Sequence, residues 1–192
     1  MFLARRPTVA VIERFLRDSQ DLPLSYGPTG LVRDVPVGRP FDEQVVAIGR
    51  GEEDFKRARA ALMAWKQFDI GWVELFPRQA LVEIGTVVAV VIRHLGFWSM
   101  NGARVLYHVD GADHGRFGYA YGTLTNHAES GEELFEVFLD AATGDVSYRI
   151  RAISWPQSML ATLGAPWVRV LQARFRRHSA AAMARAARAA SR

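Results

Sequence analysis

The chain has 192 residues, of which 49% are hydrophobic and 23% charged, and these values are typical of a soluble globular protein that folds as a single domain. It contains no cysteine, which excludes disulfides, thiolate metal sites and a cysteine nucleophile, and is consistent with a cytoplasmic location. The net charge of +4 is unevenly distributed, because nine arginines and no acidic residue follow Asp145.

The hydropathy of the chain argues against a signal peptide and against a membrane-spanning helix. The N-terminal stretch lacks the long apolar run and the small-residue cleavage site of a signal peptide. The longest apolar run, residues 84–92, is about half of what a bilayer-spanning helix needs. We therefore expect no membrane span.

The first third of the chain is predicted to hold two helices and two short strands. Apolar residues spaced for one helical face predict a helix over 8–18. Residues 19–40 contain four prolines and three glycines, which indicates an irregular connection with one short strand. A strand over 45–48, a glycine turn and a helix from about 52 to 66 follow, and the first turn of this helix is acidic, as the helix dipole favours.

From residue 70 the apolar pattern changes to period two, which is typical of strands. Short glycine- and aspartate-rich turns separate the segments, and connections this short require antiparallel neighbours. The pattern therefore predicts an antiparallel meander of six to seven strands. The expected strands span 71–77, 85–95, 103–110, 116–124, 132–140 and 146–154.

The C-terminal part returns to helix. A short helix over 157–164 is expected to end at Gly164, and Pro166 suits the first turn of a helix that runs to about residue 189. The apolar stripe of this long helix needs a sheet to cover it. We predict an α+β fold in which a curved antiparallel sheet wraps around the C-terminal helix and leaves a space between them. Within the single domain of residues 1–192, the segments are 1–40, 41–156 and 157–192.

Three blocks carry a resemblance to a known family. They read FKRARAALMAWKQFDIGWVELFP, FGYAYGTLTNHAESGEELFEVFLD and YRIRAISWPQSMLATLGAPWVRVLQARFRRHSAAAM, and the resemblance spans roughly residues 15–183. The blocks resemble uncharacterised protein family 0548, a domain-of-unknown-function group of bacteria and plants. The resemblance implies no known activity, but it implies a helix-grip fold like that of the START and birch-pollen-allergen superfamily. The single helix after the first strand and the extra N-terminal segment depart from the usual pattern of that superfamily.

The densest polar stretch, residues 118–135, is the main candidate for a site. Tyr119 and Tyr121 are two apart on a predicted strand, so they project from the same face. His127 and the glutamates that follow it could transfer protons, bind a ligand, or simply satisfy the turn of a hairpin, and the turn is the favoured interpretation. The ligand-binding residues that we expect are Tyr119, Tyr121, His127, Arg104, Glu132 and Trp72.

Three functions remain open. The leading hypothesis is a binding module for a small apolar or amphipathic ligand, held in a pocket between the sheet and the C-terminal helix. The first alternative is an enzyme of the hydrolase or isomerase type that uses His127 with Glu132 or Glu133, and this is the less favoured interpretation. The second alternative is binding to an anionic surface or nucleic acid through the arginine-rich C-terminal helix, although 22 arginines against two lysines indicate a general preference for arginine.

No cofactor or metal is expected. The Gly-x-Gly before the second helix imitates a dinucleotide-binding turn, but three acidic residues follow it and would repel a pyrophosphate. The histidines and carboxylates lack the spacing of a metal site. The pattern leaves open the oligomeric state and whether Arg149 and Arg151 point outward or into a cavity.

Overall fold

The structure is a computed structural model that describes residues 1–33, 41–110, 115–156 and 165–188. Its strands form one antiparallel sheet in the order β2-β8-β7-β6-β5-β4-β3, with the short β1 added beside β5. The strands are β1 (Phe2–Leu3), β2 (Asp42–Arg50), β3 (Val73–Phe76), β4 (Val87–Arg93), β5 (Trp98–Asp110), β6 (Arg116–Thr123), β7 (Glu129–Leu139) and β8 (Asp145–Pro156).

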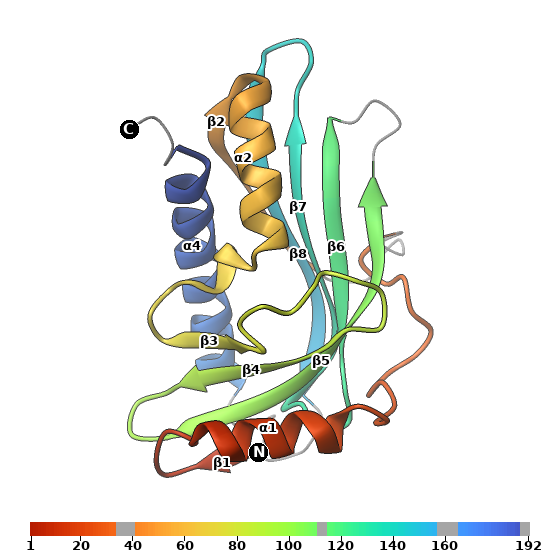
Figure 1. Cartoon of the computed structure of the whole chain (residues 1–192), viewed down its shortest axis with the longest axis vertical. Helices are drawn as coiled ribbons and strands as arrows, with labels where there is room; N and C mark the ends of the chain where they lie inside the picture. Colours follow the sequence, from red (N-terminus) through yellow and green to blue (C-terminus); the bar gives the residue numbers. More distant parts are fainter. Residues whose placement is uncertain (34–40, 111–114, 157–164, 189–192) are drawn as a thin grey trace.

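Helices cover both faces of the curved sheet. Figure 1 shows α2 (Gly51–Met63) and α4 (Ala165–Arg188) on its concave side, while α1 (Val9–Ser19) crosses it on the other side. A single turn of 3-10 helix, η1 (Lys66–Phe68), connects α2 to β3. The predicted α+β helix-grip fold, with its antiparallel meander and its long C-terminal helix, is confirmed.

The boundaries of several elements differ from the prediction for identifiable reasons. β2 extends over Asp42–Arg50 because it pairs with β8 along this whole length, including polar positions that carry no apolar signal. α2 ends at Met63, before the expected residue 66, because Trp65 adopts a left-handed conformation (φ 56°) that stops the helix. The helix expected over 157–164 lies outside the described residues.

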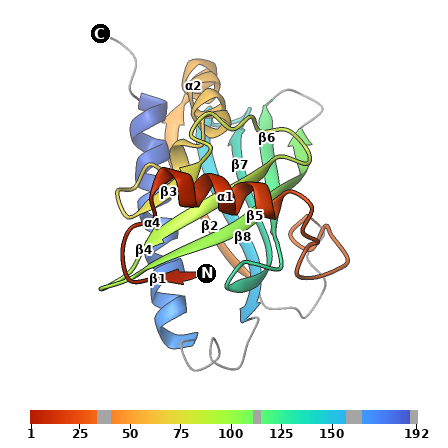
Figure 2. The ribbon, with the colours of Figure 1, turned by 60° about the horizontal axis from the view of Figure 1, so that its bottom comes forward.

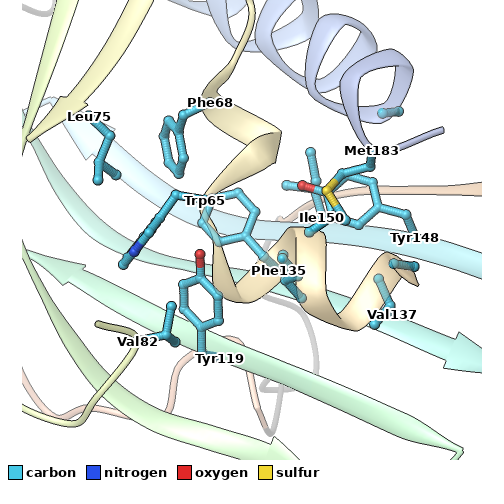
Figure 3. Close-up of a cluster of buried hydrophobic side chains, with 14 of the residues drawn as sticks. Trp65, Phe68, Leu75, Val82, Tyr119, Phe135, Val137, Tyr148, Ile150 and Met183 are labelled. Carbon is cyan, nitrogen blue, oxygen red and sulfur yellow. The ribbon is translucent and has the colours of Figure 1, made fainter. Parts of the chain in front are cut away.

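The main hydrophobic core fills the concave side of the sheet. Tyr119, Phe135 and Tyr148 come from three neighbouring strands and are almost fully buried there. Figure 3 shows Tyr119 and Phe135 close to Trp65, which follows α2, and Tyr148 beside Met183 of α4. The ring of Trp65 meets that of Tyr119 edge-on, with 4.9 Å between the centroids, an arrangement that aromatic pairs favour.

The convex side is buried as well. Ile12 and Phe15 of α1 pack on Ala89 and Met100 of β4 and β5, and Figure 2 shows α1 lying across these strands. The irregular N-terminal segment packs on β6, β7 and β8, where Leu31 joins a second cluster. Because both faces of the sheet are covered, its central strands carry apolar residues in both phases.

Candidate functional site

A cavity of about 650 Å³ lies on the concave side of the sheet. The sheet forms one wall, and η1, the start of β3 and α4 close it from the other side. Apolar and aromatic side chains make up much of its lining, among them Phe68, Trp72, Val90, Ile92, Leu171 and Phe175. Its volume falls within the range of roughly 300–1,000 Å³ that is usual for small-molecule sites.

Strands β6 and β7 contribute a polar wall to the cavity. Tyr121 and Glu133 are direct cross-strand partners on the concave face, and the Tyr121 hydroxyl donates to Oε2 of Glu133 at 2.7 Å. Burial raises the pKa of the Glu133 carboxyl to about 7 and that of the Tyr121 hydroxyl well above its ordinary value. Near neutral pH, Glu133 therefore exchanges between a protonated and an ionised form.

The turn between β6 and β7 places His127 and Glu129 on the same wall. Nδ1 of His127 lies 3.0 Å from both the backbone nitrogen and the carbonyl oxygen of Glu129. Burial lowers the pKa of His127 to about 4, so the ring is neutral at physiological pH. Burial also raises the pKa of Glu129, whose carboxylate accepts a hydrogen bond from Nε2 of Gln172 on α4 at 2.9 Å.

Strand β5 adds a short polar chain to the lining. Asn101 donates to the Val90 carbonyl at 3.3 Å, and its Oδ1 accepts the N–H of Ala128 at 3.2 Å. Its neighbour on the same face, Ser99, lies 2.9 Å from Nε2 of His94. Asn101 thus fixes the turn between β6 and β7 to the sheet, so the position of the turn does not depend on a ligand.

The structure brings three of the six expected ligand-binding residues together. Tyr121, His127 and Trp72 all border the cavity. Trp72 is held by its indole N–H, which donates to Nδ1 of His178 on α4 at 3.2 Å. These three residues come from β6, from the turn after it and from the segment before β3.

The other three expected residues do not present side chains to the cavity. Tyr119 is fully buried in the packed core, where its hydroxyl accepts a hydrogen bond from Gln67. The guanidinium of Arg104 donates to the carbonyls of Gln20 and Leu22 after α1, at 2.6 and 3.0 Å. Each side chain is therefore fixed by a structural partner.

Glu132 borders the cavity, but its carboxylate lies on the opposite face of β7. There it accepts hydrogen bonds from the hydroxyls of Tyr26 and Tyr107 and from the N–H of Gly30. The carboxylate thereby holds the N-terminal segment against the sheet. The expected base–acid pair of His127 and Glu132 is not formed, and among the described residues no hydrogen bond joins His127 to Glu133.

The structure shows the direction and the partners of the arginines whose orientation the sequence left open. Arg149 and Arg151 point outward from the convex face, where Arg149 pairs with Glu136 at 2.9 Å and Arg151 pairs with Glu43 at 2.7 Å. On α4, Arg176 borders the cavity and pairs with Asp42 at 3.2 Å, and Arg174 lies over the ring of Trp72. Part of the positive charge of α4 is therefore engaged within the molecule.

Sequence reasoning missed most of the apolar wall. Leu171 and Phe175 belong to the apolar stripe of α4, and they were not among the expected ligand-binding residues although the pocket was expected beneath this helix. Gln172, one position from Leu171, was the available signal, because a polar residue beside that stripe indicates a polar partner such as Glu129. His94, which the sequence did not single out, also borders the cavity.

The described residues contain neither a cluster of metal-binding side chains nor a helix that could span a membrane. Within 1–33, 41–110, 115–156 and 165–188, no three histidine, aspartate or glutamate side chains are grouped as a metal site requires. In the same part of the chain, no helix combines the length and the apolar character needed to cross a membrane.

Comparison with known proteins identifies relatives across kingdoms. Residues 25–182 match the family described as "Domain of unknown function (DUF1990)". A UPF0548 protein of Dictyostelium discoideum is 31% identical over 91% of this chain and 90% of its own, and one of Deinococcus radiodurans is 34% identical over 97% and 99%.

Solved structures of distant sequence share the fold. A crystal structure from Helicobacter pylori, described as a hypothetical protein, matches with a TM-score of 0.58 at 10% identity and covers 85% of this chain and 95% of its own. One from Thermus thermophilus matches with a TM-score of 0.57 at 14% identity, over 80% of this chain and 100% of its own. At these identities the likeness concerns the fold alone.

Proposed function

The chain belongs to the family of domains of unknown function called DUF1990, and for this member of the family we propose a function as a binding module for a small apolar or amphipathic ligand. The ligand occupies the cavity between the concave face of the sheet and α4. Its apolar body contacts the aromatic wall, and its polar group faces the wall that β6 and β7 contribute.

The observation that carries this proposal is the cavity itself. A volume of about 650 Å³ accommodates a small organic molecule, whereas natural cores are packed with few voids larger than a water molecule. Phe68, Leu171 and Phe175 face this space from η1 and α4. Apolar surface that folding leaves uncovered is available for burial by an apolar ligand, at roughly 25 cal/mol per Å².

The polar wall favours an amphipathic ligand over a purely apolar one. Tyr121, Glu133 and Gln172 supply hydroxyl, carboxyl and amide groups from three elements, β6, β7 and α4. A few polar groups in a mainly apolar pocket are what orients a small molecule. The arrangement lacks the histidine–carboxylate pair that the enzyme hypothesis needs, so the binding function is the better supported.

A cavity-filling substitution tests the proposal. Ala152 borders the cavity from β8, and the change Ala152→Phe places a ring in the space that the ligand needs. We expect the unmodified protein to bind a neutral, environment-sensitive naphthalene dye saturably with one site, as measured by fluorescence titration. In Ala152→Phe the affinity should fall at least about tenfold, since overpacking costs on the order of 1–3 kcal/mol.

The matched control is Ala10→Phe, which makes the same change on the exposed face of α1. It should leave the affinity for the dye unchanged. Dye binding that is equally strong in both variants would place the dye outside the cavity and contradict the proposal, as would a failure of the unmodified protein to bind it.

A further inference from the structure

Glu133 differs from the other buried carboxylates of the sheet in its partners. Glu136 accepts from two arginines, Arg116 and Arg149, and Glu132 accepts from two tyrosines and from the backbone N–H groups of residues 30–32. Glu133 accepts one hydrogen bond, from the neutral hydroxyl of Tyr121. Among the described residues, no arginine, lysine or histidine forms an ion pair with it.

The free side of the Glu133 carboxyl borders the cavity. The side chain lies on the concave face of β7, in phase with the core residues Phe135 and Val137, and retains accessible surface that its neighbours lack. Tyr121 occupies Oε2, so Oε1 is the oxygen available to a ligand. A buried carboxylate without a cationic partner is costly, and such groups are found where a ligand or a reaction needs them.

Other charges near Glu133 do not supply this partner. Two cationic groups border the cavity: the Met1 ammonium donates to the Met100 carbonyl at 3.0 Å, and Arg176 on α4 pairs with Asp42 of β2 at 3.2 Å. Glu129, four residues before Glu133 on the same strand, adds a second carboxyl to the wall. Burial lowers the pKa of His127 to about 4, so its ring is neutral at physiological pH. The polar wall is therefore acidic, with a hydrogen-bond acceptor directed at an apolar space.

We propose that Glu133 recognises the polar group of the ligand and selects an apolar molecule that carries a protonated amine. This rests on the proposed function, because it assigns a ligand class to the same cavity. The ammonium group donates to Oε1 of Glu133 and supplies the cationic partner that this carboxyl lacks, while Tyr121 holds the carboxyl in place. A ligand with a carboxylate group meets two carboxyl groups of like charge and is excluded.

Three probes with one apolar body and different polar groups test this selection. Naphthylmethylamine is cationic near neutral pH, naphthylmethanol is neutral and naphthoic acid is anionic. Isothermal titration of the full chain at pH 8 should show the amine binding at least about tenfold more tightly than the alcohol, because a charge-assisted hydrogen bond exceeds a neutral one. The acid should bind most weakly of the three.

The substitution Glu133→Gln keeps the size of the side chain and removes its charge. We expect the advantage of the amine over the alcohol to fall to within about twofold, while the alcohol binds as it does to the unmodified protein. Glu132→Gln makes the same change one residue earlier, on the opposite face of β7, and should keep the selectivity for the amine.

The neutral naphthalene dye separates the two proposals. If the dye binds while the three naphthalene probes bind equally, recognition by Glu133 is overturned and the cavity remains a binding site. The same conclusion follows if Glu133→Gln keeps the selectivity for the amine. If neither the dye nor any of the three probes binds, both proposals are wrong.

Discussion

At the residue scale, the informative difference is between two neighbouring glutamates. Glu132 and Glu133 follow each other on β7, yet one holds the N-terminal segment on the convex face and the other borders the cavity. The period of two predicts that they lie on opposite faces. It does not reveal which face holds the cavity, because Leu134 and Phe135 are both buried and either phase could be the inner one.

The same limit applies to the other residues of the polar stretch. The sequence correctly places Tyr119 and Tyr121 on one face, but only Tyr121 reaches the cavity. Trp65 and Gln67 cover Tyr119, and their position depends on where α2 ends. Contacts of this kind arise from the packing of distant segments, which a local pattern does not encode.

The raised pKa of Glu133 makes a prediction about stability. Burial raises its pKa to about 7 from an ordinary value of 4.5, so the folded state keeps a proton that the unfolded state releases. The contribution of Glu133 to the free energy of unfolding should therefore fall by about 3 kcal/mol as the pH rises from about 4.5 to 7. Glu133→Gln removes this loss, so the variant should be more stable than the unmodified protein at pH 8 and similar to it at pH 4.5.

Urea denaturation at these two pH values measures the effect. The charged groups that act on Glu133, namely Glu129, Arg176 and Asp42, are unchanged in the variant. His127, whose pKa is lowered from 6.5 to about 4, makes the opposite contribution over nearly the same pH range, and this contribution is the same in both proteins. A variant that is less stable than the unmodified protein at pH 8 would show that the ionised Glu133 carboxylate stabilises the fold, which is the opposite of the cost expected from its burial.

At the element scale, the order and type of the helices and strands follow from the sequence better than their ends do. The change of period at residue 70 predicted the strands from β3 to β8, because turn residues separate them clearly. The two-residue β1 was not predicted, since its pairing with β5 depends on Ser99 and Trp98 rather than on any pattern of its own. β5 begins at Trp98, five residues before the expected start, because pairing with β4 extends the strand through polar positions that carry no apolar pattern.

The close approach of β7 to β8 depends on one glycine. Gly131 has φ of +150°, and a Cβ atom at this position would meet the carbonyl oxygen of Ile153 and lie 2.7 Å from Cα of Ser154. Because both neighbours are backbone of a paired strand, they have little room to move. We expect Gly131→Ala to lower the free energy of unfolding by more than about 2 kcal/mol in urea denaturation.

Gly144 provides the matched control for this effect. It also has a positive φ, of +75°, but the nearest atom to an added Cβ would be 3.8 Å away, in the side chain of Arg50. Gly144→Ala therefore incurs the conformational strain without the clash and should cost about 1 kcal/mol. Equal losses of unfolding free energy in the two variants would contradict the prediction. They would mean that β7 and β8 move apart at Gly131 and accommodate the added methyl group at little cost.

At the scale of the whole molecule, the space between sheet and helix was predictable but its lining was not. A long helix covering a curved sheet implies some space between them, and the resemblance to helix-grip proteins pointed the same way. The size of the cavity depends on how far α4, η1 and the sheet stand apart, which is set by contacts such as Trp72 with His178 and Gln172 with Glu129. None of these pairs has a spacing that the sequence reveals.

The most direct test of the central claim is a nuclear magnetic resonance titration of methyl-labelled protein with the neutral naphthalene dye. Ligand rings in the cavity should shift the methyl signals of Val90, Ala152 and Leu171, with saturation near one equivalent. The methyl signals of Ile12 and Leu31, which lie in the two convex-face clusters, should not move. Equal shifts in both groups, or shifts confined to the convex face, would contradict a ligand site between the sheet and α4.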